Sequence, residues 1–534
     1  MPPVKRILPL LLAASACAHA PEAIPSPEAP PASPAPPPSP ESATLTRIRT
    51  DVDALLTAQG EATWLAWTSG APLDVSGAMR GREWLADGGA LTALTAIPPS
   101  PDPAETARRR VLRDFLLGER LAAAAPPPAS GAVDPSFTFE GRTVALRDSA
   151  SMLAAEPDAS RRAALDEARA GAAARGAKTA DDRAAAISEA VRRLGLGDTM
   201  AVATELRRLP PASLAQLASR TLDATGPAYC AAMDALARGE LGVPLASTRL
   251  RDLPRILRAS HEPRAHAASR LVPDGQAAAS AAGVDLATRV RLDDRRAAGK
   301  SQRPLAVAVR VPDDVRLSAM PSGGASEARA FLHELGVAIY LQAVRASGVE
   351  PRRLGTPAAI DTWGFLLEAL AADPAWLHDR AGIVGDALAR EIKAAQAERL
   401  HAVRMQAARL LREVDIAGGA RPGAAGDAKL LSRVLCRPVS TEDAARWPIP
   451  RDPLLASADK LRGALLAAQV ESALAEQGNG PWWRWKGAPE WLAPIWAEGS
   501  PASPEELARR VGVGEISPEP LARVARARFG AAGW

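Results

Sequence analysis

The sequence predicts a mainly α-helical fold with a small antiparallel β ribbon. Of the 534 residues, 47% are hydrophobic but only 4% are aromatic, so helix-favouring residues such as Ala and Leu must form most of the core. Long segments place apolar residues three and four positions apart. These segments are 104–124, 148–173, 181–194, 380–414 and 455–476. The clear exceptions are 305–310 and 315–320, which alternate as strands do around a turn at Pro312.

The charges of the chain are nearly balanced. It carries 65 Lys and Arg against 61 Asp and Glu, a net charge of +4, and the two signs are interspersed. Nucleic-acid-binding domains generally concentrate basic residues on one face. We therefore expect no nucleic-acid partner.

The N-terminus has the pattern of a secretory signal. Two basic residues precede a short apolar stretch, and small residues then end on Cys17. This pattern resembles a bacterial lipoprotein signal, so residues 1–17 are expected to be the signal, with Cys17 as the lipidated residue. An ordinary signal peptide cleaved after Ala20 is the alternative. Residues 18–43 are rich in Pro, Ala and Ser and are expected to form a disordered linker.

These features predict a lipid-anchored protein of the cell envelope. Ala18 follows Cys17, in place of the Asp that retains lipoproteins in the inner membrane of some bacteria. By analogy, this favours the outer membrane, with the protein facing the periplasm. The other two cysteines, Cys230 and Cys436, could pair in an oxidising envelope, although one pair does not make a disulfide scaffold.

A glycine turn and a helix that carries His-Glu follow the second predicted strand. Gly323-Gly324 precedes the expected helix 325–346, on which His333-Glu334 lies. Zinc peptidases place His-Glu-x-x-His in this setting, because two His one helical turn apart bind the same metal ion. Here Val337 stands at the second His position, and its side chain cannot ligate zinc.

The surroundings of this motif resemble the helical gluzincin zinc metallopeptidases, the group that contains thimet oligopeptidase and angiotensin-converting enzyme, and especially their bacterial branch. The resemblance is carried by residues 299–336, by the segment 361–377, which is similar to the family's second metal-binding helix, and by segments within 452–508. It implies a two-lobed, zincin-like helical body similar to thimet oligopeptidase. The N-terminal helical lobe would span 44–300 and a degenerate metallopeptidase-like lobe 301–534.

The resemblance also implies roles for single residues. His333 matches the first zinc ligand and Glu334 the general base, while Asp361 stands at the position of a ligand Glu and is one methylene shorter. Lys460 stands where the relatives have a Tyr that donates a hydrogen bond to the tetrahedral intermediate. We therefore expect His333 and Asp361 to be vestigial metal ligands, Glu334 to be a vestigial base, and Val337 to mark the lost ligand position.

The leading hypothesis is a catalytically inactive, metallopeptidase-like lipoprotein that holds no cofactor. It would bind a peptide or protein in the groove between the lobes, as a peptide-binding protein or scaffold, with the strand at 315–320 pairing with the peptide backbone. The alternative is an active zinc metallopeptidase with unusual ligands, in which His378 or His401 replaces the missing donor. A third interpretation is that His333-Glu334 only makes a hydrogen-bonded contact between helices.

Overall fold

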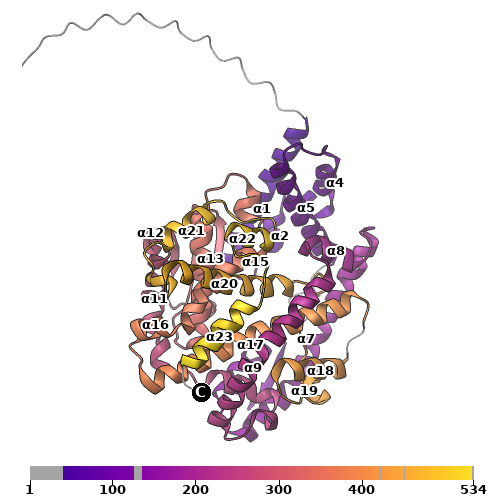
Figure 1. The fold of residues 1–534 in the computed structure, drawn as a ribbon. Coiled ribbons are helices and arrows are strands. Elements are labelled where there is room, and N and C mark those ends of the chain that lie inside the picture. Colours follow the sequence, from indigo (N-terminus) through magenta and orange to yellow (C-terminus); the bar gives the residue numbers. More distant parts are fainter. Residues whose placement is uncertain (1–39, 126–134, 421–422, 450–451, 532–534) are drawn as a thin grey trace, which may run out of the picture.

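The computed structural model describes residues 40–125, 135–420, 423–449 and 452–531, which are mainly helical (Figure 1). The predicted signal at 1–17, its Cys17 and residues 18–39 of the predicted linker lie outside the described residues. Helix α1 (Pro40–Ser69) begins inside the predicted linker, with a proline in its first turn, where the missing N–H costs no hydrogen bond. Within the described ranges, no helix is long and apolar enough to cross a membrane.

The other α-helices are α2 (Val75–Met79), α3 (Trp84–Asp87), α4 (Gly89–Ala96), α5 (Pro103–Ala124), α6 (Ser149–Ala155), α7 (Ala159–Arg193), α8 (Thr199–Arg207), α9 (Pro211–Leu241), α10 (Leu253–Arg258), α11 (Leu271–Ala281), α12 (Leu286–Arg289), α13 (Ala325–Ala343), α14 (Val349–Arg353), α15 (Pro357–Glu368), α16 (Pro374–Trp376), α17 (Gly385–Ala417), α18 (Ala424–Leu435), α19 (Thr441–Arg446), α20 (Ser457–Gly478), α21 (Ala488–Ala497), α22 (Pro504–Arg510) and α23 (Glu519–Ala531). Short 3₁₀ or π turns are η1 (Leu146–Asp148), η2 (Leu245–Ser247), η3 (Leu250–Asp252), η4 (Pro263–His266), η5 (Ala268–Arg270), η6 (Ala369–Ala372), η7 (Leu377–Ala381) and η8 (Trp482–Arg484).

The helices α5, α13, α17 and α20 match their predicted segments closely, whereas the break predicted between 173 and 181 is wrong. The chain is interrupted earlier, between α6 and α7, and α7 then runs without a break to Arg193. Pro157 ends the first helix, and Asp158 caps the second by accepting a hydrogen bond from the backbone N–H of Arg161 at 2.8 Å.

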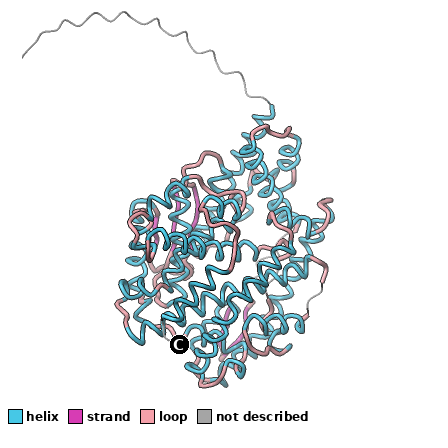
Figure 2. Tube along the Cα trace, in the orientation of Figure 1, coloured by secondary structure: helices cyan, strands magenta, loops and turns pink. Residues whose placement is uncertain are grey.

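The predicted ribbon is present and belongs to a three-stranded sheet. β4 (Leu305–Arg310) and β5 (Asp314–Ser318) pair antiparallel, with Leu305 opposite Ser318. A short strand, β3 (Arg291–Asp293), adds to β5 in parallel, so the strand order is β3-β5-β4. The strands lie among the helices in Figure 2. The sequence did not predict β3, nor a separate hairpin of β1 (Ser136–Phe139) and β2 (Arg142–Ala145), because segments this short carry little periodicity.

The larger hydrophobic cores combine segments that are distant in sequence. One core joins α9 with α17, α18, α20 and α23, and a second surrounds α13 and α15 beside the sheet. A third lies between α1, α4 and α5. A cut at residue 300 passes through the first two cores, and the predicted division into two lobes stays a prediction. Cys230 of α9 and Cys436, which follows α18, form a disulfide across the first core.

The helices α13 and α15 approach closely at two glycines. A Cβ added at Gly336 would collide with the carbonyl group of Trp363 and lie 2.9 Å from the Cα of Gly364. A Cβ at Gly364 would lie 2.8 Å from Nε2 of His333. These two residues therefore let α13 bring His333 against the face of α15.

Candidate active site

Three helices bring the predicted site residues together. α13 carries His333 and Glu334, α15 carries Asp361, and α20 carries Lys460. Asp361 is buried, while His333 and Glu334 are partly buried. The residues that the resemblance assigns to the metal centre are therefore neighbours in space, and their roles stay predictions.

Both ring nitrogens of His333 face carboxylates. Nδ1 lies 3.1 Å from Oε2 of Glu368, and Nε2 lies 3.6 Å from Oδ1 of Asp361. The edge of the ring meets Phe365, with centroids 4.6 Å apart. Burial opposes protonation, but the two carboxylates outweigh it and raise the pKa of His333 to about 9. The imidazole is consequently held as a cation at neutral pH.

The second oxygen of Asp361 is paired with Lys460. Nζ of Lys460 lies 2.8 Å from Oδ2 of Asp361. Burial favours the neutral acid, yet His333 and Lys460 together lower the pKa of Asp361. Asp361 is thus a carboxylate between two cationic side chains.

Arg329 extends this arrangement along α13. Its guanidinium lies 2.6 Å from Oε1 of Glu368 and 2.7 Å from Oε2 of Glu398 on α17. Burial again opposes ionisation, but Arg329 and His333 lower the pKa of Glu368 to about 2. Six side chains therefore form a continuous row of alternating positive and negative charges, which we call the charge row. In order, they are Lys460, Asp361, His333, Glu368, Arg329 and Glu398.

Glu334 is held by the sheet. The backbone N–H of Ala306 in β4 donates to Oε2 of Glu334 at 2.8 Å, and burial raises the pKa of this carboxyl. The expectation that the strand at 315–320 pairs with a peptide is wrong, because β5 has a neighbouring strand on each side. β4 is an edge strand of the sheet. The guanidinium of Arg353 donates a hydrogen bond to the carbonyl of Ala308 in this strand, at 2.9 Å. The protein's own side chains thus occupy polar groups along that edge.

A zinc ion does not fit the donors at this position. Zinc sites in hydrolases generally have three protein ligands and one open position. Val337 has no donor atom and Asp361 carries the ammonium of Lys460, so of the three implied ligands only His333 is left. The positive charge that a metal would supply is provided here by side chains of the chain itself.

His378 and His401, the two histidines considered as replacement metal ligands, make other contacts. Nδ1 of His401 is hydrogen-bonded to the hydroxyl of Tyr229 at 2.9 Å, and burial lowers the pKa of His401 to about 4. His378 is exposed and pairs with Asp379 at 3.0 Å. His401 does line the same cavity as His333.

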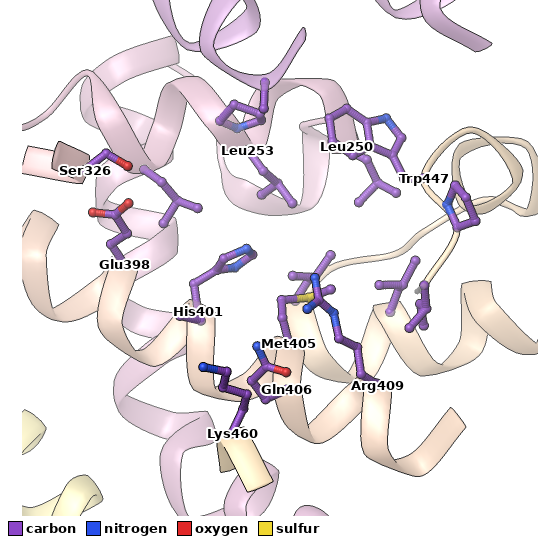
Figure 3. A pocket seen from close by; sticks show the side chains of 18 of the residues that line it. Leu250, Leu253, Ser326, Glu398, His401, Met405, Gln406, Arg409, Trp447 and Lys460 are labelled. Carbon is purple, nitrogen blue, oxygen red and sulfur yellow. The ribbon is translucent and has the colours of Figure 1, made fainter. Parts of the chain in front are cut away.

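A cavity of about 920 Å³ extends from the charge row between α7, α10 and α17. Its walls are mainly apolar. In Figure 3, two sets of side chains face each other across it: Leu250, Leu253 and Trp447 on one side, and His401, Met405, Gln406 and Arg409 of α17 on the other. Among the described residues, Nε of Arg409 has no hydrogen-bond partner. The cavity therefore combines apolar surface with the cationic side chain of Arg409, whose Nε is buried.

Comparison with solved structures identifies the fold. The crystal structure of an M32 carboxypeptidase from Deinococcus radiodurans R1 matches with a TM-score of 0.55 and 14% sequence identity, over 92% of this chain and 99% of that chain. The chain has a helical, zincin-like peptidase fold. At this identity the likeness shows the fold alone. No protein-family model matches the sequence, and no curated protein matches it significantly.

This comparison confirms the mainly α, zincin-like prediction in its coarser form. The narrower assignment to the group of thimet oligopeptidase and angiotensin-converting enzyme stays a prediction, as does the lipoprotein signal. Within this fold, sequence reasoning missed Glu368 as a partner of His333, and Arg329 as a partner of Glu368. Glu368 lies seven residues after Asp361 and Arg329 four before His333, so helical spacing placed each on the same face as its neighbour.

Proposed function

We propose that this protein is a catalytically inactive, metallopeptidase-like binding protein of the bacterial cell envelope. The observation that carries the proposal is the ion pair between Lys460 and Asp361, together with Val337 at the position of the second implied ligand. Zinc activates water for hydrolysis only when protein ligands hold it with an open coordination position. At this position one ligand is replaced by Val337, and the other two are engaged in the charge row.

The alternative, an active peptidase with unusual ligands, would require a donor in place of Val337. It would also require Asp361 to release Lys460, since a carboxylate paired with an ammonium at 2.8 Å is a weak metal ligand. The contacts of His378 and His401 favour neither of them as that donor. The inactive protein is therefore the better-supported function.

The cavity indicates what such a protein would bind. A volume of about 920 Å³ with mainly apolar walls suits several side chains of an extended peptide or protein segment. Arg409, which is partly buried with Nε unpaired, suits an acidic group on that ligand. We propose a peptide or protein segment with apolar side chains and a carboxylate as the occupant.

An envelope location is part of the proposal. Lipidation at Cys17 would attach the body to a membrane, on the outer membrane facing the periplasm, through the Pro-rich segment before α1. The disulfide between Cys230 and Cys436 supports an oxidising compartment, because such bonds are rare in the cytosol of most bacteria.

The test combines binding and cleavage in one experiment. Short peptides with apolar side chains and a free carboxylate are titrated against the purified protein, with tryptophan fluorescence reporting occupancy beside Trp447. We expect binding that weakens at least about tenfold in Arg409→Gln and is unchanged in the exposed control Arg526→Gln. The same peptides, incubated with the protein and zinc, should be recovered intact. Cleavage that requires Glu334 would contradict the proposal.

A further inference from the structure

Outside the candidate active site, two histidines converge on one buried glutamate. His261 precedes the short turn η4, His266 is the last residue of that turn, and Glu391 lies in the second turn of α17. Nδ1 of His261 and Nε2 of His266 each lie 2.8 Å from Oε1 of Glu391. Their side chains are 7%, 4% and 0% exposed. Among the described residues, this is the one group of three or more His, Cys, Asp or Glu side chains whose ligand atoms all lie within 4.8 Å of one another.

We propose that His261, His266 and Glu391 bind a structural zinc ion. Two imidazole nitrogens and one carboxylate oxygen are a ligand set that zinc accepts, whereas calcium and magnesium prefer oxygen alone. Zinc bonds of about 2.0–2.2 Å place ligand atoms within about 4 Å of one another. The three atoms therefore reach a common ion through small side-chain movements.

The groups around these residues match those that orient metal ligands. A metal-bound histidine usually donates its other N–H to a carboxylate, and Nε2 of His261 lies 3.3 Å from Oε2 of Glu398. Oε2 of Glu398 is also paired with Arg329, while Nε2 of His261 makes no hydrogen bond to any other described residue. The backbone N–H of Glu262 donates to Oε2 of Glu391 at 2.7 Å, which leaves Oε1 for the ion.

The ion would have a structural role. The three ligands do not line the large cavity, so a substrate there does not reach them. The carbonyl of His266 accepts a hydrogen bond from the N–H of Gly324, directly before α13, at 2.8 Å. Glu398 also pairs with Arg329. The zinc would thus fasten α17 to the segment that holds the start of α13.

The experiment measures zinc in the purified full chain after chelator treatment and reloading. We expect about one zinc per chain, a rise in Tm on reloading, and an absorption spectrum of the cobalt-substituted protein typical of tetrahedral nitrogen and oxygen ligands. Zinc affinity should fall at least about tenfold in His266→Gln and Glu391→Gln. His333→Gln and the exposed control His378→Gln should keep it.

Two results would overturn the proposal. The first is a folded wild-type protein that takes up no zinc and shows no change in Tm, which decides the question even if the Glu391 variant fails to fold. The second is zinc that persists in His266→Gln and is lost in His333→Gln. That result would place the ion at the candidate active site, and it would contradict the proposed function as well, whereas the first result leaves the proposed function intact.

Discussion

Nζ of Lys460 lies 2.8 Å from Oδ2 of Asp361, and the two side chains form an ion pair. The other carboxylate oxygen of Asp361, Oδ1, lies 3.6 Å from Nε2 of His333. In a zincin-like fold, this places a lysine ammonium beside two residues that resemble metal ligands. A fixed cation neutralises the buried carboxylates but has no open coordination position for water. Under the proposed function, the fold keeps the arrangement of these side chains without the chemistry of a zinc peptidase.

Restoring a zinc site should require the removal of Lys460 as well as new ligands. The variant Val337→His with Asp361→Glu supplies the donors that the resemblance implies, but the lysine still pairs with the carboxylate. With Lys460→Tyr added, the triple variant should bind about one more zinc ion per chain than the parent protein does. Titration with zinc measures this, with Lys460→Tyr alone as the control.

The same triple variant should also gain slow peptide hydrolysis. The double variant lacks both the metal and a hydrogen-bond donor to the intermediate, so it should be slower by at least about 10²–10³-fold. If the triple variant folds and binds no additional zinc, then positions 333, 337 and 361 do not converge on one ion.

His333 should contribute stability that depends on pH. Its pKa is raised from about 6.5 when unfolded to about 9 in the folded protein. The contribution is therefore fully present below pH 6.5 and is lost as the pH rises through 9. It amounts to up to about 3 kcal/mol of unfolding free energy.

Denaturant unfolding between pH 6 and 10 measures this effect. His333→Gln should lower the free energy of unfolding near neutral pH, and its difference from wild type should shrink above pH 9. The exposed variant His378→Gln is the control. A difference that is independent of pH would show that His333 is not held as a cation.

Gly336 should be required for the close contact between α13 and α15. Gly336→Ala places a methyl group against the carbonyl of Trp363 and should cost about 1–3 kcal/mol of unfolding free energy. Gly118→Ala in α5 is the matched control, because a Cβ there meets no heavy atom within 4 Å. That change should stabilise the protein by up to about 1 kcal/mol, through helix propensity. Equal effects of the two substitutions would contradict the predicted contact.

Anchoring by Cys17 is tested by fractionation. Cys17→Ser should leave the membrane fraction and appear soluble or unprocessed, because no acyl chain is attached. Cys230→Ser should remain in the membrane fraction and serves as the control. A wild-type protein that is already fully soluble in the envelope would refute the lipoprotein assignment.

Periodicity and motif spacing were sufficient to predict much of this molecule. They gave the helical fold class, the ribbon of β4 and β5 and the position of His333-Glu334 on α13, because each depends on local sequence. The continuous α7 and the strand β3 were missed, since a proline cap and a three-residue pairing leave little periodic signal. The contact of Lys460 with Asp361 was missed for another reason. It joins residues 99 apart, and only the packing of α15 on α20 brings them together.

The proposed zinc site at His261, His266 and Glu391 could not be predicted from the sequence either. His261 and His266 are five residues apart on an irregular segment, and Glu391 is distant in sequence. No helical ligand spacing connects them, so a motif search has nothing to detect. Bulk zinc content is consequently not a test of the candidate active site, and the decisive measurement has to depend on residues of that site.

The most direct test of the central claim compares zinc-dependent peptide hydrolysis by wild type and Glu334→Gln. Both proteins are loaded with zinc and incubated with a broad mixture of peptides, and new termini are counted by mass spectrometry. Because no zinc-bound water is expected beside Glu334, the two proteins should give the same background. Hydrolysis by wild type that depends on zinc and falls about 10²-fold or more in Glu334→Gln would show a working peptidase and contradict the account.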